Sequence, residues 1–190
     1  MKIILAGLIL LTMVGCIAPC YAYSLDKPAD VDWCTLQSGK VSFYFPTDGS
    51  DPAPTLIKLF NSANNTIDIA VYSIDNQDIA NALVDATNRG IIVRIITDRR
   101  KSVYKYQLIA LSILKAHNIP ILINSHAGLM HMKMSIIDKK YMAMGSFDYT
   151  LEASQTNDEI MLILSESQAI QVCQDQFDRM WADENGFEKY

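Results

Sequence analysis

The chain has 190 residues, of which 50% are hydrophobic and 19% charged, so it has enough apolar material for the core of one globular domain. Its 8 glycines and 6 prolines are too few for a fibrous or disordered protein. The formal net charge of −5 excludes a protein that binds nucleic acid through its overall positive charge. Any nucleic-acid binding therefore has to come from a local basic patch.

The first segment has the character of an export signal. Lys2 is followed by a predominantly apolar run that has the length of a signal-peptide core and is too short to span a membrane. Cleavage after Ala22 is one route of processing. Lipidation is another, because Met13–Cys16 is similar to a bacterial lipobox with Cys16 as the lipid-bearing residue. We expect a signal peptide over residues 1–22 and an exported bacterial protein, periplasmic or secreted. Membrane attachment is expected only if Cys16 is lipidated or the signal is not cleaved.

The remaining cysteines bear on the compartment. Cleavage after Ala22 leaves Cys34 and Cys173 in the mature chain. In an oxidising compartment this pair is compatible with one disulfide between the N-terminal segment and the C-terminal helix, and two buried thiols are the alternative. The sequence contains no CxxC and no His-rich cluster, so it does not support a metal site, and no cofactor is expected.

Strand-like and helix-like segments alternate after an irregular segment over residues 23–40. Strands are expected at residues 41–46, 66–74, 91–98, 119–125, 130–138, 139–147 and 159–165, and helices at residues 55–63, 75–90, 106–118 and 167–186. This order predicts one α/β domain over residues 41–190. Its expected architecture is an α/β/α sandwich, with a mixed, largely parallel β-sheet flanked by helices on both faces.

Charged residues interrupt the apolar stretch HMKMSIID. His131 and Lys133 are two residues apart, so on a strand their side chains point to the same face. An imidazole can attack or transfer a proton, and an ammonium group neutralises negative charge, so the pair suits an anionic centre. Asp138 has the opposite parity at the end of the strand, where it is expected to order the turn. A lone His-x-Lys pair is more often an edge histidine beside a lysine whose head reaches solvent.

Further polar residues follow in the sequence. Gly145 lets the backbone come close to a ligand, and the hydroxyl of Ser146 can donate to a phosphate oxygen. Asn157–Glu159 precedes an apolar strand, from which one carboxylate can reach the site and hold the second ring nitrogen of a histidine.

The longer sequence GLMHMKMSIIDKKYMAMGSFDYT resembles the HxKxxxxD…GS motif of the phospholipase D superfamily. The order of elements over residues 40–185 resembles that of the small single-motif members, the phospholipase D-like bacterial endonucleases. The resemblance implies that His131 is the nucleophile that forms a phosphohistidine, Lys133 and Ser146 bind phosphate, Asp138 is a motif residue of mainly structural importance, and Glu159 orients the histidine.

One position departs from the family motif. The family usually has asparagine two residues after the serine, and this chain has Asp148 at that phosphate-binding position. A carboxylate there would repel a phosphodiester unless it is protonated, turned away or paired with a cation.

The resemblance implies a metal-independent phosphodiesterase that works as a homodimer. An in-line displacement needs a nucleophile and an acid on opposite sides of phosphorus, so one histidine cannot serve as both in the first step. A chain with a single motif is therefore expected to share one active site with a second copy across a two-fold axis.

The substrate is open between nucleic acid and lipid. Arg99, Arg100 and Lys101 follow the carboxyl end of a predicted strand, where they can hold the phosphate backbone of DNA or RNA, and the alternative is a solvated loop. Phospholipid is the other substrate class, since the net charge is negative and Asp148 replaces asparagine. A non-catalytic phosphate-binding module is the third interpretation, and Asp148 is its only support.

Overall fold

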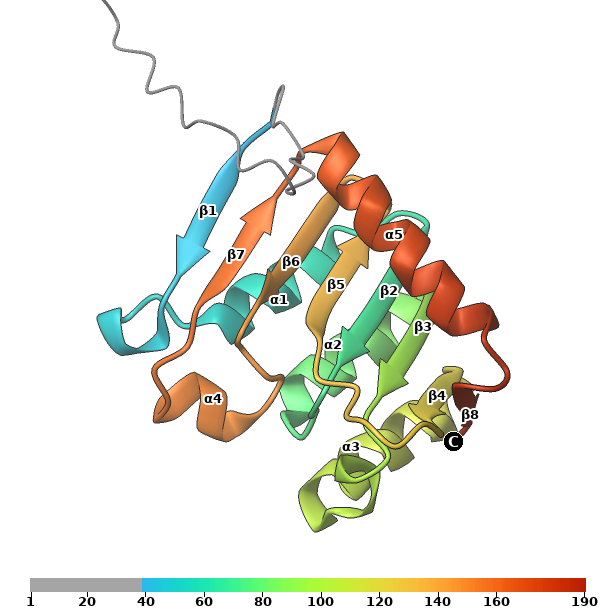
Figure 1. Cartoon of the computed structure of the whole chain (residues 1–190). Coiled ribbons are helices and arrows are strands. Elements are labelled where there is room, and N and C mark those ends of the chain that lie inside the picture. Colours follow the sequence, from blue (N-terminus) through green and yellow to red (C-terminus); the bar gives the residue numbers. More distant parts are fainter. Residues whose placement is uncertain (1–38) are drawn as a thin grey trace, which may run out of the picture. The chain divides into compact units, whose positions relative to one another are not determined.

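An eight-stranded mixed sheet is the centre of the computed structural model, which describes residues 39–190 (Figure 1). The strand order is β1-β7-β6-β5-β2-β3-β4-β8. The strands are β1 (Val41–Tyr44), β2 (Thr66–Val71), β3 (Ile92–Thr97), β4 (Ile121–Asn124), β5 (Lys133–Ile137), β6 (Tyr141–Gly145), β7 (Met161–Leu164) and β8 (Phe187–Lys189). The helices are η1 (Pro46–Asp48), α1 (Pro52–Asn61), α2 (Gln77–Asn88), η2 (Lys101–Val103), α3 (Lys105–Ala116), α4 (Leu151–Gln155) and α5 (Ser167–Ala182).

The sheet is mixed, as predicted, but its parallel part is smaller than expected. Parallel pairing joins β2 to β3 and β3 to β4, and helices α2 and α3 supply the crossovers that parallel neighbours need. The other strand pairs are antiparallel. One cause of the antiparallel pairing is the tight hairpin between β5 and β6. Asp138 and Lys139 in its turn adopt φ of 52° and 54°, values that suit a short hairpin turn.

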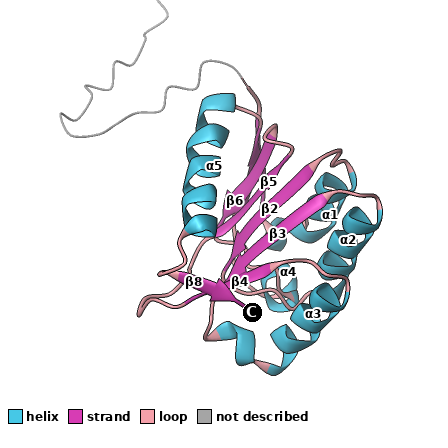
Figure 2. Cartoon of the chain, turned by 90° about the vertical axis from the view of Figure 1, so that its right-hand side faces the viewer, coloured by secondary structure: helices cyan, strands magenta, loops and turns pink. Residues whose placement is uncertain are grey.

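Helices cover both faces of the sheet, as the sequence predicts (Figure 2). Helices α1, α2 and α3 pack on one face, and the core there includes Phe60, Leu83 and Leu111. Helix α5 covers the other face, where Phe177 packs with Met134 and the remaining residues of a second core cluster. Successive residues of a strand point to opposite faces, so the sheet supplies apolar side chains to both layers.

Local signals explain where the helices begin and end. Helix α1 begins earlier than expected because the Asp51 side chain caps it by accepting from the N–H of Ala53, and Pro52 suits the first helical turn. Asn76 caps α2 in the same way. Helix α4 and strand β8 were not predicted, since elements this short carry little periodicity. Within residues 39–190, no helix has the length and the apolar character needed to cross a membrane.

A charged cluster fastens α5 to the sheet. The guanidinium of Arg94 donates to Asp68 on β2 and to Asp178 on α5, each at 2.7 Å, and Gln174 of α5 donates to Asp68 at 2.8 Å. Arg94 also lies 4.9 Å from the ring centre of Phe177. Because each buried charge has a partner, the cluster avoids the cost of an isolated buried ion.

Several predictions concern residues beyond this part of the chain. The signal peptide over residues 1–22, the irregular segment up to residue 38, lipidation at Cys16 and the cysteine partner Cys34 all lie outside the described residues. The expected disulfide between Cys34 and Cys173 therefore stays a prediction.

Candidate active site

The predicted nucleophile and phosphate-binding lysine lie together at one end of β5. The strand begins at Lys133, so His131 precedes it, although the N–H of Tyr72 donates to the carbonyl of Met132 at 2.8 Å and continues the pairing with the β2 segment. The Nζ of Lys133 is 3.1 Å from the Nε2 of His131. The side chains thus meet on one side of the chain, as their spacing predicts, while Met134 is buried in the core.

Tyr72 is a site residue that the sequence did not reveal. Its ring centre lies 4.5 Å from that of His131, at an interplanar angle of 59°. The Nζ atoms of Lys133 and Lys101 lie 4.8 Å and 5.1 Å from the Tyr72 ring centre, close enough for cation–π attraction. Its position directly after the central strand β2 is a signal that could have identified it, because ligands of α/β sheets bind at such carboxyl ends.

Asp148 belongs to the same cluster. Its Oδ2 lies 3.5 Å from the Nζ of Lys133, and its Oδ1 accepts the backbone N–H of Ser73 at 3.0 Å. The side chains of Lys133 and Asp148 are 7% and 22% exposed. Burial raises the pKa of Asp148 above the ordinary value of an aspartate, although Lys133, the N–H of Ser73 and His131 act in the opposite direction. Asp148 is therefore paired with a cation. Such pairing is one of the three conditions under which a carboxylate at this motif position does not repel a phosphodiester.

The loop after β2 is held in place from α3. The buried Gln107 accepts from the Ser73 hydroxyl at 2.9 Å and from the N–H of Ile74 at 3.1 Å. Its amide nitrogen donates to the hydroxyl of Thr97 at the end of β3, at 3.1 Å. This side chain fixes the backbone that carries Tyr72 and presents the Ser73 amide to Asp148.

Ser146 and Glu159 are hydrogen-bonded to each other, and the predicted contact of Glu159 with His131 stays a prediction. The Ser146 hydroxyl donates to Glu159 and accepts the N–H of Ile160 at 3.1 Å, and Asn157 donates to the other Glu159 oxygen at 3.3 Å. Within residues 39–190 the hydrogen bonds of Glu159 thus hold Ser146 rather than the His131 ring. The physical reason is the pairing of β6 with β7, which sets Gly145 opposite Met161 and so brings the two residues together.

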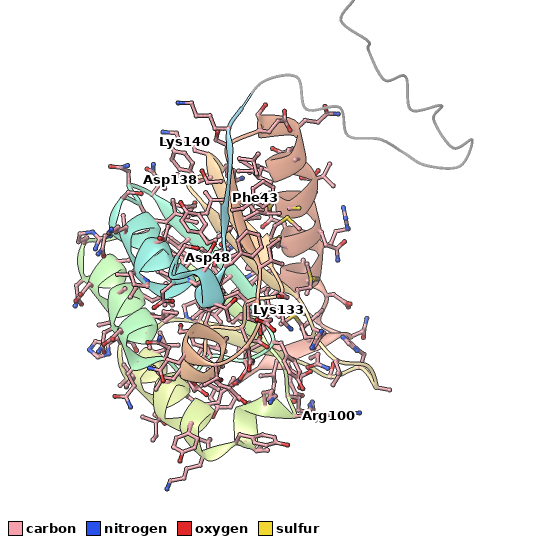
Figure 3. The ribbon with its side chains drawn as sticks, turned by 90° about the vertical axis from the view of Figure 1, so that its left-hand side faces the viewer. Phe43, Asp48, Arg100, Lys133, Asp138 and Lys140 are labelled. Carbon is pink, nitrogen blue, oxygen red and sulfur yellow. The ribbon has the colours of Figure 1, made fainter. Side chains whose placement is uncertain are left out.

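Asp138 lies away from this cluster, at the other end of β5. Figure 3 shows Lys133 and Asp138 far apart along the sheet. The Asp138 carboxylate accepts the backbone N–H groups of Asn64, Asn65 and Thr66 at 2.8, 2.7 and 2.9 Å. Burial alone would raise its pKa, but these three donors outweigh burial and hold the pKa below the ordinary value. Asp138 therefore joins the β5–β6 turn to the start of β2, in agreement with the structural role expected of it.

Replacing Asp138 with asparagine is expected to lower the free energy of unfolding by about 1 kcal/mol near neutral pH, since solvent still reaches this carboxylate. A folded-state pKa below that of the unfolded chain gives stability that is complete above the ordinary pKa and is lost as pH falls through the lowered value. The difference from wild type should shrink below about pH 4. Urea unfolding over this pH range measures it, and Asp85→Asn on the exposed side of α2 is the control.

The three basic residues that follow β3, Arg99, Arg100 and Lys101, have different surroundings. Arg99 is engaged in structure, because its guanidinium pairs with Glu188 and donates to the carbonyl of Asn124 at 3.0 Å. The contact of Arg99 with nucleic acid stays a prediction, because its side chain is still 48% exposed in this pair. Arg100 is exposed, and its guanidinium donates to the carbonyl of Ala127 at 3.4 Å. Lys101 reaches the site itself through Tyr72.

Within residues 39–190, the residues around His131 and Lys133 form no metal-binding group and do not line the cavity beside β4 and β8. In the described part of the chain, no group of three or more His, Cys, Asp or Glu side chains is arranged to hold a metal ion. A cavity of about 610 Å³ lies beside β4 and β8, with Lys115, Trp181 and Tyr190 among its lining residues. None of the site residues described above lines that cavity.

A His–Lys pair at the end of a central strand, in a sheet covered by helices on both faces, is the arrangement that the motif predicts for the phospholipase D superfamily. The family described as "Cardiolipin synthase, PLD-like domain" matches residues 56–181. The chain belongs to this PLD-like family of the phospholipase D superfamily. The family and the α/β fold expected from the sequence are thereby confirmed.

Curated relatives include cardiolipin hydrolases and phospholipases D. The chain is 33% identical over 132 residues to the mitochondrial cardiolipin hydrolase of Chlamydomonas reinhardtii, covering 67% of this chain and 58% of that protein. It is 32% identical over 133 residues to a phospholipase D of Rickettsia bellii (strain RML369-C), covering 70% of this chain and 65% of that protein. The chain therefore spans a little more than half the length of the cardiolipin hydrolases that it matches.

Two solved structures are similar over nearly their whole length. Nuc from Salmonella typhimurium, a phospholipase D family member, has a TM-score of 0.74 and 25% identity, covering 80% of this chain and 99% of that one. NucT from Helicobacter pylori has a TM-score of 0.70 and 27% identity, covering 76% of this chain and 96% of that one.

Proposed function

We propose that the protein is an exported, metal-independent phosphodiesterase that hydrolyses the phosphodiester bonds of DNA or RNA. The observation that carries this proposal is the His131–Lys133 pair, in which Nε2 and Nζ lie 3.1 Å apart. His131 is exposed, so a phosphodiester can reach it, and the nearly buried Lys133 is held in place to neutralise phosphate charge.

The pair supports a two-step displacement. The Nε2 of His131 attacks phosphorus, a P–N bond forms, and the P–O bond to the leaving alkoxide breaks as that oxygen takes a proton. Water then attacks the phosphohistidine and gives its proton to the group that protonated the leaving alkoxide, the P–N bond breaks, and the imidazole is regenerated. Lys133 neutralises the charge on the non-bridging oxygens throughout.

The acid for the leaving group is proposed to come from a second copy of the chain. The sequence contains three histidines. His117 lies at the end of α3 with Nδ1 2.9 Å from the carbonyl of Ile113, and His126 packs edge-on against Phe187 at 5.6 Å. His131 is thus the histidine of the cluster, which supports a homodimer that brings two His131 side chains to one phosphate.

The surroundings of the site support nucleic acid as the substrate. Tyr104 and Tyr106 are 60% and 67% exposed, and Lys101 and Lys105 lie over their rings at 5.0 Å and 5.8 Å. Exposed aromatic rings beside cations suit stacked bases and a phosphate backbone. The match to nearly the whole of Nuc and NucT, against about half of the cardiolipin hydrolases, supports a protein of the small single-motif type.

Phospholipid is the second candidate substrate. The names of two relatives, a cardiolipin hydrolase and a phospholipase D, favour it. The exposed apolar side chains of Val103 and Leu129 also suit the interfacial region of a lipid bilayer.

A substrate panel without added metal tests the proposal. Single-stranded DNA, duplex DNA, RNA, and vesicles of phosphatidylcholine or cardiolipin are incubated with the protein, and the products are separated. Cleavage of nucleic acid, with affinity that falls steeply as salt rises, is expected. Cleavage of lipid alone would reject the proposed nuclease activity in favour of a phospholipase activity. Binding of phosphate without any cleavage would indicate a non-catalytic module.

Chelation is expected to leave the activity unchanged. Two lysines, one from each copy, take the place that metal ions have in many phosphoryl-transfer enzymes. Turnover is measured after extensive dialysis against EDTA and again after Mg²⁺ is added. Loss of activity in EDTA with recovery in Mg²⁺ would contradict the metal-free mechanism.

A further inference from the structure

The two carboxylate oxygens of Asp148 make different contacts. Oδ1 accepts the N–H of Ser73 at 3.0 Å, and that N–H belongs to the loop fixed by Gln107. This side of the group must therefore stay an acceptor. Oδ2 faces Lys133 at 3.5 Å, on the side where a phosphate would bind. Whatever Asp148 does to a substrate, it does through Oδ2.

A phosphate at Lys133 changes the surroundings of Oδ2. In the free protein, an ionised Asp148 is compensated by the Lys133 ammonium. A bound phosphodiester brings a second negative charge to the same cation in a partly desolvated place, where like charges repel strongly. Protonation of Oδ2 removes the repulsion and supplies one O–H donor, while Oδ1 remains free to accept from Ser73.

We propose that Asp148 binds the substrate phosphate in its protonated form, with Oδ2–H as the donor, so that binding of substrate is coupled to uptake of one proton. This inference rests on the proposed function, because it assigns the phosphate to the His131–Lys133 pair. The presence of Asp148 in place of the family's asparagine then has a functional consequence. The protein is a phosphodiesterase whose affinity for substrate falls as the pH rises.

The groups that face Asp148 agree with this assignment. Lys133 lies on β5, His131 precedes β5, the Ser73 N–H comes from the loop after β2, and the buried phenol of Tyr149 is the next residue in the chain. Burial keeps the pKa of Asp148 above its ordinary value even beside Lys133. Sharing that cation with a phosphate would raise it further.

The pH dependence of hydrolysis is compared between wild type and Asp148→Asn. Bis(p-nitrophenyl) phosphate is the substrate, because it stays a monoanion over the whole range, and p-nitrophenol is read at its isosbestic wavelength. We expect wild-type kcat/KM to fall by about tenfold per pH unit above the pKa of Asp148, mainly through KM. In Asp148→Asn the amide is a permanent donor, so this fall should be absent and activity at alkaline pH should exceed wild type.

Asp75→Asn is the matched control. Asp75 is another partly buried carboxylate with a pKa raised by burial. Like Asp148 it accepts a backbone N–H, that of Leu151 at 3.0 Å, but Lys133 is paired with Asp148. The substitution changes the net charge by the same amount, so it reports any general electrostatic effect. Its pH profile should follow wild type. An equal change in both variants would overturn the assignment to Asp148.

A binding measurement keeps the proposal testable without turnover. Sulfate remains a dianion across this pH range, and calorimetry in buffers of different ionisation enthalpy counts the protons taken up when it binds. Wild type should take up about one proton more than Asp148→Asn. If wild type takes up none, or if Asp148→Asn loses sulfate affinity and activity at every pH, the proposal is wrong. Proton uptake in a protein that cleaves no phosphodiester would leave this inference standing and reject the proposed function instead.

Discussion

Replacement of His131 with asparagine is expected to lower phosphodiester hydrolysis by at least about 1,000-fold while the fold stays intact. The substitution removes the nitrogen proposed to form the bond to phosphorus, and Lys133 alone cannot replace it. The imidazole is exposed and lies outside the two apolar cores, so its loss leaves their packing unchanged. Turnover is measured with the preferred substrate of the panel, and circular dichroism and thermal unfolding report the fold.

His126→Asn is the matched control, because His126 is exposed and packs against Phe187 instead of Tyr72. It should retain wild-type turnover. Wild-type rates in His131→Asn would remove the nucleophile from the proposal and the proposed function with it.

Mixing the two chains separates the nucleophile from the homodimer. If each site needs His131 from both copies, wild type exchanged with an excess of His131→Asn should lose most of its activity, because mixed dimers are inactive. Full retention of wild-type activity in the mixture, or an active monomer in light scattering, would reject the shared site but leave His131 as the nucleophile.

Replacement of Gly145 with alanine is expected to have the largest effect on the fold, at least about 3 kcal/mol of unfolding free energy. A Cβ at this position would lie 2.0 Å from the carbonyl oxygen of Ile160, and φ is 155°. That carbonyl also accepts the N–H of Ser146 at 2.9 Å, so it cannot move away without breaking the hydrogen bond that places Ser146. Urea unfolding measures the loss.

Gly90→Ala separates the clash from backbone strain. Gly90 also has a positive φ, 88°, but open space surrounds the position of its Cβ. Its cost should be only about 1 kcal/mol. Should Gly145→Ala be too unstable to purify while Gly90→Ala folds, the steric argument holds. Equal stability of the two variants would contradict it.

The sequence predicted the main layers because their signals are local. The β-branched runs marked β2 and β3, and the apolar spacing of α2 and α5 gave two helices close to their observed bounds. The two-residue spacing also placed His131 and Lys133 side by side and left Asp138 apart.

The remaining features depend on contacts between distant segments. The partner of Glu159 is decided by the pairing of β6 with β7, and no short motif encodes this pairing. Tyr72 is an ordinary aromatic residue until the fold sets it against His131. The extent of antiparallel pairing likewise follows from hairpins and returns of the chain that propensity alone does not determine.

Gln107 has a consequence for recognition. Its side chain joins the end of β3 to the loop after β2 before any ligand arrives, so Tyr72 and the Ser73 amide are already ordered in the free protein. A substrate that meets an ordered loop does not lose affinity to the conformational entropy of folding that loop. Helix α3, through Gln107, thus sets how rigid the loop beside the His131–Lys133 pair is.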